Sequence, residues 1–291
     1  MQIQKAVITA AAKTQRTLPM QTLFDQCGRE RSVLSLIVNE ALRAGIRDIC
    51  VVVWPGDEEA YAKLLTDDGA HFTFVQQKEA RGYAHAVFCA REFAKDEPFL
   101  HLVGDHIYAG TESTSCARRL VEAATAAACS VSAVQITREN LLPLYGTVGG
   151  QPVSGTPDLY RIDTVMEKPS PTQAEQRLIV PGLRSGQYLC FYGMHVLTPV
   201  VFEILAGLLS AKNEANAARV CLSAALAALA QREQYLAMVQ QGRRFDVGVK
   251  YGLFTAQLAL ALNGQDRDEV LTELVSVLAA RNLLLEQGAG A

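Results

Sequence analysis

Short aliphatic and β-branched runs alternate with amphipathic helical stretches through the first half of this chain. One such run, Asp-Ile-Cys-Val-Val-Val at 48–53, stands between helical stretches at 32–45 and 57–66. A strand, a helix and a second strand in this order form a βαβ unit, in which the two strands run parallel. We therefore expect an α/β fold, in which helices cover a mainly parallel central sheet.

The same patterns continue along most of the chain. Strands are predicted at 4–9, 48–53, 71–75, 98–103, 129–136 and 235–239. Helices are predicted at 32–45, 57–66, 80–94, 113–127, 198–209, 214–231, 250–263 and 266–287. Residues 138–190 contain Pro, Gly and short strand-like pieces instead of long helices, so we place an inserted subdomain there. We expect one domain over 1–249, followed by C-terminal helices over 250–291 that are a candidate oligomerisation element.

Composition narrows the function classes. The chain has 291 residues, of which 49% are hydrophobic, and this is enough for one large core with a smaller subdomain. A net charge of −3 argues against a general nucleic-acid or anionic-membrane binder, so any anion site must be local. No secretory signal pattern and no apolar run of the length that spans a bilayer is found, and the seven cysteines lack C-x-x-C spacing. We expect a cytoplasmic protein with reduced thiols.

Two features stand at predicted strand ends. The first strand leads into a polar loop that contains Lys13 and Arg16, and such loops hold phosphates with backbone N–H groups and a cationic side chain. Asp105 follows the strand at 98–103, and Asp246 ends another short strand-like segment. Two carboxylates at one sheet edge suit Mg²⁺, which takes oxygen ligands. The alternative for each aspartate is a turn or a helix N-cap.

The N-terminal segment resembles a known family. Residues 5–19, KAVITAAAKTQRTLP, are similar to the signature loop of bacterial UTP:glucose-1-phosphate uridylyltransferases, K-A-V-I-P-V-A-G-L-G-T-R-M-L-P. The family's G-L-G-T is replaced by Ala12, Lys13, Thr14 and Gln15, whereas Ala11 and Arg16 coincide with it. The replacement matters because glycine permits positive φ and lets the backbone approach a triphosphate closely.

Further segments extend the resemblance. FVQQKEARGYAHAVFCA at 74–90 is similar to the family's F-V-R-Q-G-E-A-K-G-L-G-H-A-V-L-C-A, with Gln77 at its uracil-reading glutamine and Gly82 retained. Tyr145-Gly146 matches a Y-G pair on the family's sugar side. Residues 166–169 match its V-E-K-P, in which the glutamate contacts sugar hydroxyls and the lysine contacts the sugar phosphate.

The resemblance also bears on the charged groups of the site. The family has metal-binding aspartates after its fourth strand and in a D-x-G near its C-terminal end, which correspond to Asp105 and Asp246. The first of these follows Val-Gly here, in place of the family's Leu-Pro. The family's second active-site lysine, in P-K-E-M-L-P, has no counterpart in the segment 22–31, where Arg29 and Arg31 are the candidate substitutes.

The resemblance implies a three-layer, nucleotide-diphospho-sugar transferase-like fold and a Mg²⁺-dependent transfer. An oxygen of glucose 1-phosphate, or of a related sugar 1-phosphate, would attack the α-phosphorus of UTP in line, forming UDP-glucose or a related product and pyrophosphate. The implied residues are Arg16 and Lys168 for catalysis, Ala11, Ala12, Lys13, Gln77 and Gly82 for the nucleotide, Tyr145, Gly146, Glu167 and Lys168 for the sugar, and Asp105 and Asp246 for the metal.

Two readings of the altered loop remain open. The first is an active uridylyltransferase, and Lys13 facing the triphosphate would favour it. The second is a catalytically impaired sugar-nucleotide-binding or regulatory protein, and a phosphate space filled by Ala12 and Thr14 would favour that. A related nucleotidyltransferase with another base or acceptor, or a glycosyltransferase on a similar scaffold, is a further alternative. The family also implies a homo-oligomer.

Overall fold

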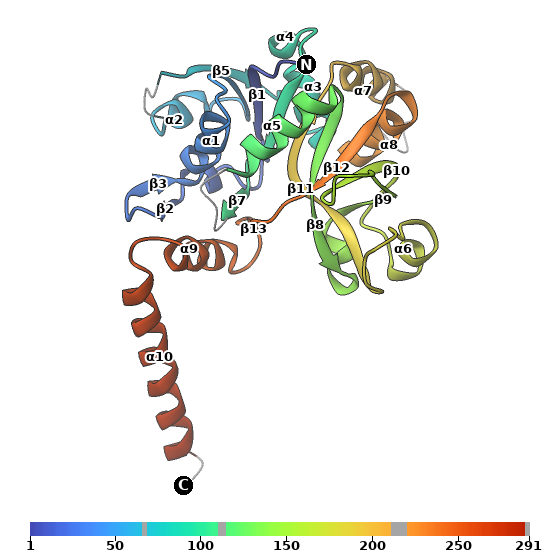
Figure 1. Ribbon diagram of the computed structural model, residues 1–291. Coiled ribbons are helices and arrows are strands. Elements are labelled where there is room, and N and C mark those ends of the chain that lie inside the picture. The colour runs from blue at the N-terminus through green and yellow to red at the C-terminus, as the bar shows by residue number, and fades with distance from the viewer. Residues whose placement is uncertain (66–68, 110–114, 211–219, 289–291) are drawn as a thin grey trace.

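A nine-stranded sheet forms the centre of the molecule (Figure 1). The structure is a computed structural model that describes residues 1–65, 69–109, 115–210 and 220–288. The strand order is β5–β4–β1–β6–β11–β8–β12–β10–β9. The strands are β1 (Lys5–Ala10), β4 (Asp48–Val53), β5 (His71–Gln76), β6 (Phe99–Val103), β8 (Ser130–Arg138), β9 (Gly146–Pro152), β10 (Leu159–Glu167), β11 (Gln187–Leu197) and β12 (Tyr235–Val239).

Helices cover both faces of the sheet. Successive side chains of a strand point to opposite sides, so each strand contributes apolar residues to both faces. In β1, Ala6 and Ile8 pack in a core with residues of α1 and α5, whereas Val7 packs in a second core with residues of α3, α7 and α8. These helices are α1 (Val33–Arg43), α3 (Tyr83–Cys89), α5 (Cys116–Ala127), α7 (Val200–Ser210) and α8 (Leu222–Arg232). The predicted α/β class is confirmed, and burial on both faces explains why these strands read as continuous apolar runs.

The direction of the strands changes across the sheet. β5, β4, β1 and β6 run parallel, and so do β12 and β8. β11 runs antiparallel to β6 and β8, and β10 runs antiparallel to β9 and β12. The sheet is therefore mixed and not mainly parallel as expected, and its continuous run of parallel strands, β5–β4–β1–β6, comes from the first half of the chain. A short connection such as that between β9 and β10 joins only antiparallel strands, since a parallel pair needs a long crossover.

The segment predicted as an insertion forms β9, β10 and α6 (Pro171–Arg177), together with the beginning of β11 and a short 3₁₀ helix (Glu139–Leu144). It has a small core of its own, which includes Leu142, Leu178 and Cys190. β9 and β10 also join the main sheet, because β10 pairs with β12 and β9 pairs with β11. The segment thus extends the central sheet and does not form a separate one.

Several predicted helices are shorter in the structure. The predicted helix at 80–94 begins only at Tyr83, since Gly82 at its N-cap has a φ of 95°, and it is divided into α3 and α4 (Arg91–Ala94). The predicted helix at 57–66 is reduced to α2 (Glu58–Ala62). The predicted helical residues 66, 113–114 and 214–219 lie outside the described part of the chain.

Two small antiparallel sheets of two strands each and the C-terminal helices complete the fold. The elements are β2 (Thr22–Phe24) with β3 (Glu30–Ser32), β7 (His106–Ala109) with β13 (Arg243–Asp246), α9 (Gly252–Leu262) and α10 (Arg267–Gly288). α10 projects from the body (Figure 1), and its Val275 and Val277 are each 64% exposed. None of the described helices is both long enough and apolar enough to cross a membrane.

Candidate functional site

A cavity of about 610 Å³ opens at the carboxyl ends of β1 and β6. Open α/β sheets bind ligands at this edge, and the volume lies within the range of about 300–1,000 Å³ that is usual for small-molecule sites. Its lining comes from the loop after β1, the beginning of α3, the end of β6 and the end of β10. The lining residues are Thr9, Ala10, Ala11, Ala12, Lys13, Thr14, Gln15, Leu18, Pro19, Gln77, Ala80, Gly82, Tyr83, Ala86, Val103, Gly104, Asp105, His106, Leu144 and Lys168.

The altered loop borders this cavity and leaves it open. Ala12 and Thr14 line the space without filling it, and the backbone turns at Ala12, whose C=O accepts from Gln15 N at 2.9 Å. Lys13 also lines the cavity, and its Nζ lies 5.5 Å from the centroid of the Trp54 ring. The loop therefore brings one cation to the space where a triphosphate would lie.

The side chain of Arg16 pairs with a buried carboxylate, that of Asp57. Its Nε donates to both carboxylate oxygens of Asp57 at 3.1 and 2.9 Å, and a further bond runs from its Nη2. Asp57 is only 7% exposed, so its carboxylate needs such a partner. The backbone C=O of Arg16 also accepts from the hydroxyl of Tyr61 at 2.8 Å. Arg16 is not among the described residues that line the cavity, and its predicted contact with the phosphates stays a prediction.

Gln77 and Gly82, which are predicted to contact the nucleotide, both line the cavity. Gln77 is 4% exposed, and its Nε2 donates to the C=O of Gly82 at 2.9 Å and lies 3.2 Å from Nδ1 of His85. A carbonyl only accepts, so this contact assigns the amide NH₂ of Gln77 to Gly82. The amide oxygen of Gln77 is left to accept from a ligand donor, such as the imide N–H of a pyrimidine base.

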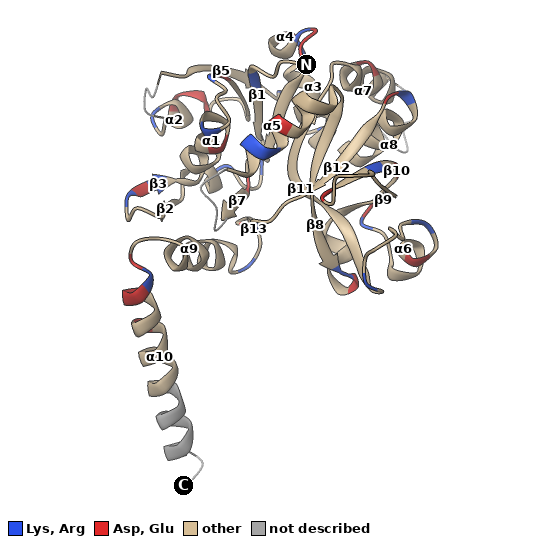
Figure 2. Ribbon diagram, viewed as in Figure 1, with Lys and Arg blue, Asp and Glu red and all other residues tan. Residues whose placement is uncertain are grey.

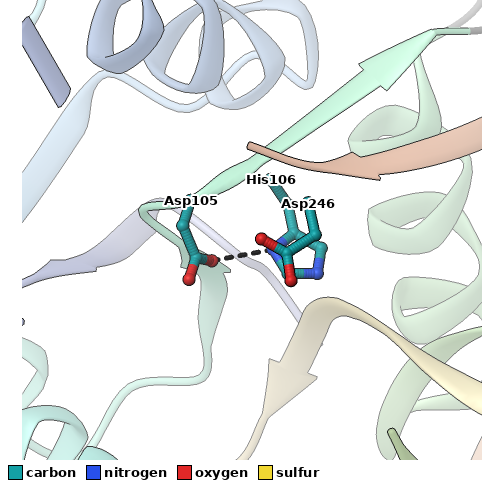
Figure 3. A group of neighbouring side chains, drawn as sticks. All are labelled: Asp105, His106 and Asp246. Atoms are coloured by element: carbon teal, nitrogen blue, oxygen red, sulfur yellow. Dashed lines mark hydrogen bonds and ion pairs between the residues drawn. The ribbon is translucent and has the colours of Figure 1, made fainter. Parts of the chain in front are cut away.

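Asp105 and Asp246 lie close together, and His106 joins them (Figure 3). The ligand atoms of the three residues lie within 4.8 Å of one another. The register of β7 and β13 sets this geometry, because His106 and Asp246 are cross-strand partners and Val247 N donates to the C=O of Asp105 at 2.8 Å. The sequence predicted the two aspartates and missed His106, whose only signal was its place directly after Asp105.

The pKa values of the two carboxylates shift in opposite directions. Burial opposes the ionisation of Asp105, but the hydrogen bond and the charge of His106 together bring the pKa of Asp105 below its usual value. Burial raises the pKa of Asp246, and the neighbouring charge of Asp105 adds to this. Two oxygen-donor carboxylates at a cavity of small-molecule size fit a divalent cation, which would relieve the repulsion between them.

The sugar-side residues lie where β9 and β10 pair. Gly146 stands opposite Glu167, and a Cβ on Gly146 would lie 3.2 Å from Oε2 of Glu167 and 2.8 Å from Oγ of Ser223. The hydroxyl of Ser223 donates to Oε2 of Glu167. Ser223 is a further residue that sequence patterns did not reveal, because it lies on α8, 56 positions along the chain.

Lys168 reaches the cavity from the end of β10. It adopts a φ of 46°, a value that is rare outside glycine, and its backbone N donates to the C=O of Tyr145 at 3.2 Å. The guanidinium of Arg244 lies 3.7 Å from the centroid of the Tyr145 ring. Of the four residues predicted to contact the sugar, Lys168 is among the described residues that line the cavity, whereas Tyr145, Gly146 and Glu167 are not.

The two candidate substitutes for the family's second lysine are engaged elsewhere. Nε of Arg29 lies 3.2 Å and Nε of Arg31 lies 3.6 Å from Oδ2 of Asp25. Both arginines belong to the β2–β3 region, and neither is among the described residues of the cavity wall. The lysine and arginine side chains that line the cavity in the described part of the chain are those of Lys13 and Lys168.

The family follows from a comparison of the chain with protein-family models. A model described as nucleotidyl transferase matches residues 16–262, which include the cavity-lining residues from Leu18 to Lys168 but not those of the loop at 9–15. The chain belongs to this nucleotidyl transferase family.

Individual relatives of this nucleotidyl transferase agree with that assignment. A UTP–glucose-1-phosphate uridylyltransferase 2 from Staphylococcus saprophyticus is 29% identical, over 95% of this chain and 98% of its own length. A UTP–glucose-1-phosphate uridylyltransferase from Bacillus subtilis is 26% identical, over 95% and 97%.

Solved structures share the fold. A UDP-glucose pyrophosphorylase complexed with UDP-glucose matches with a TM-score of 0.71 and 22% identity, over 89% of this chain and 98% of that one. A UTP-bound enzyme of the same name from Acinetobacter baumannii matches with a TM-score of 0.72 and 20% identity, over 94% and 99%. The predicted nucleotidyltransferase fold is confirmed.

Tyr83 lines the cavity of this nucleotidyl transferase. It stands at the position where the family motif quoted above has leucine. Its hydroxyl lies 2.6 Å from Nε2 of His101, and Nδ1 of His101 lies 3.0 Å from the C=O of Val7. Complete burial lowers the pKa of His101 to about 4, so its imidazole is neutral at pH 7. Since the carbonyl of Val7 only accepts, Nδ1 bears the proton, and the hydroxyl of Tyr83 donates to Nε2.

Tyr83→Phe is expected to lower the free energy of unfolding by about 1–3 kcal/mol, because it leaves Nε2 of the buried His101 without a donor. Urea denaturation measures the change. Tyr251→Phe is the matched control, since Tyr251 is 68% exposed and removal of its hydroxyl should change little. Equal losses in the two variants would contradict the tautomer assigned to His101.

Proposed function

We propose that this nucleotidyl transferase is a UTP:sugar-1-phosphate uridylyltransferase that forms UDP-glucose, or a related nucleotide sugar, and pyrophosphate. The observation that carries the proposal is that one cavity is lined by the Lys13 loop, by Gln77, by Asp105 and by Lys168. These are the groups needed to hold a triphosphate, a base, a cation and a sugar phosphate around one phosphorus. The names of the relatives support uridine and glucose as the base and the sugar.

The proposed mechanism is positioning with charge neutralisation, and it needs no covalent intermediate with the protein. Gln77 accepts from the base, while Lys13 and the loop amides hold the β- and γ-phosphates. Lys168 orients the sugar 1-phosphate so that its oxygen attacks the α-phosphorus in line, and Glu167 accepts from the sugar hydroxyls. Arg16, clamped by Asp57, holds the loop in shape.

Mg²⁺ is the cofactor proposed for this reaction, held by Asp105 and Asp246. When bound, it would supply positive charge to the phosphates of the two substrates. The carboxylate oxygens of the Asp105–His106–Asp246 group lie close enough to share one ion.

We also propose a cytoplasmic homo-oligomer that associates through its C-terminal helices. Phe254 of α9 is 62% exposed, and Val275, Val277 and Leu278 of α10 are 64%, 64% and 59% exposed. Figure 2 shows charged residues at the beginning of α10, and the turns of α10 that follow are largely tan. Basic and acidic residues are interspersed over the body of the molecule. Burial of exposed apolar side chains of this kind drives association.

The test is pyrophosphate release with Mg²⁺, each of four NTPs and a panel of hexose 1-phosphates, run beside calorimetric binding of UTP and UDP-glucose. Release that requires UTP, a sugar phosphate and Mg²⁺ together is the expected result. Binding without release would favour the alternative of a sugar-nucleotide-binding regulatory protein. Neither binding nor release with any nucleotide would contradict both readings.

A further inference from the structure

His106 adds a nitrogen donor to a site that otherwise offers only oxygens. Its Nδ1 lies 2.7 Å from Oδ1 of Asp105, and Asp246 approaches from the neighbouring strand (Figure 3). His106 and Asp246 come from two paired strands, and Asp105 lies in the turn directly before β7, where its C=O accepts from Val247 N at 2.8 Å. Backbone pairing thus holds the group together. The inference that follows depends on the metal site of the proposed function.

The imidazole of His106 is held in place by packing. Its side chain is 13% exposed. Gly193 lies beside it with a φ of 80°, and a Cβ there would lie 3.3 Å from Cδ2 of His106 and 2.7 Å from Cγ2 of Val103. The glycine thus leaves the space that the ring needs. A ring confined in this way stays beside the two carboxylates whether or not a cation is bound.

The donor set bears on the choice of cation. Mg²⁺ is a hard ion that is bound by oxygen ligands and keeps several waters, whereas imidazole nitrogen suits first-row transition cations. Mn²⁺ is the transition cation that carboxylates also suit. Two carboxylates with one imidazole therefore match Mn²⁺ better than Mg²⁺.

We propose that Asp105, His106 and Asp246 bind a first-row transition cation of the Mn²⁺ type in preference to Mg²⁺, with an imidazole nitrogen of His106 as a ligand. In this arrangement His106 is a ligand to the ion and takes no proton from the substrates. The two aspartates alone make the site competent for a divalent cation, and His106 determines which cation it prefers.

The test is electron paramagnetic resonance of Mn²⁺ with the full-length protein, first without nucleotide and then with UTP. Titration of the free Mn²⁺ signal measures affinity, and competition by Mg²⁺ measures preference. Spin-echo modulation should report a directly bound imidazole nitrogen. His106→Asn should remove that nitrogen coupling. It should also weaken Mn²⁺ binding by at least about 10–100-fold, the loss that follows when only a hydrogen-bond partner of a metal ligand is removed. The effect on Mg²⁺ binding should be much smaller.

His106→Gln is the second variant, and circular dichroism with thermal unfolding checks that both variants fold. The nitrogen coupling in the unmodified protein tests the proposal even if neither variant folds. Equal affinities for the two cations, absence of nitrogen coupling under both conditions, or equal losses of Mn²⁺ and Mg²⁺ binding in the variants would overturn it. If one of these results were found and the protein still released pyrophosphate with Mg²⁺, the proposed function would stand. If Mn²⁺ were bound in preference to Mg²⁺ but no turnover were found, only the proposed function would be contradicted.

Discussion

Asp105→Asn is expected to reduce Mg²⁺-dependent pyrophosphate release by at least on the order of 10²–10³-fold. Asparagine keeps the size of the side chain but lacks the negative charge with which Asp105 would hold the proposed cation. The bond from Val247 N ends on the backbone C=O of Asp105, so the substitution leaves that part of the fold intact. A coupled pyrophosphate assay over a range of Mg²⁺ concentrations measures the effect.

Asp96→Asn is the control for the loss of one carboxylate, because Asp96 is exposed in the turn after α4. It should retain the turnover of the unmodified protein. Circular dichroism should show the same secondary structure for both variants. Turnover by Asp105→Asn equal to that of the control would remove Asp105 from the metal site.

Lys13→Met should impair turnover more than Arg16→Met, the reverse of what the signature loop of the family implies. Lys13 lines the cavity, and losing a cation aimed at developing phosphate charge costs on the order of 10²–10³ in rate. Arg16→Met instead leaves Asp57, which is 7% exposed, without its partner, so its main effect should be on stability. Steady-state kinetics with UTP and urea denaturation separate the two effects.

Trp54, the single tryptophan of the chain, provides a direct signal of Lys13 movement. Since Nζ of Lys13 lies 5.5 Å from the ring centroid, a triphosphate that draws the ammonium away should change the fluorescence of Trp54. The change should be absent or much reduced in Lys13→Met and retained in Arg16→Met. A greater loss of kcat/KM in Arg16→Met, with its fold intact, would restore the phosphate-binding role to Arg16.

The sequence determined the elements whose signals are local. The run at 48–53 forms a strand with the predicted bounds, and so does the run at 235–239, because aliphatic and β-branched residues between polar turns have few other solutions in a large core. Gln77, Gly82 and Lys168 were placed by motif order along the chain, and all three line the cavity.

The tertiary structure alone decided the partners of the charged groups. Arg16 pairs with Asp57, 41 positions away, and His106 meets Asp246 only through the register of β7 and β13. The antiparallel course of β11 likewise depends on which strands become its neighbours. Periodicity and turn chemistry act over a few residues, whereas a buried carboxylate takes whichever cation the packed fold brings to it, and that choice is made by contacts far apart in the chain.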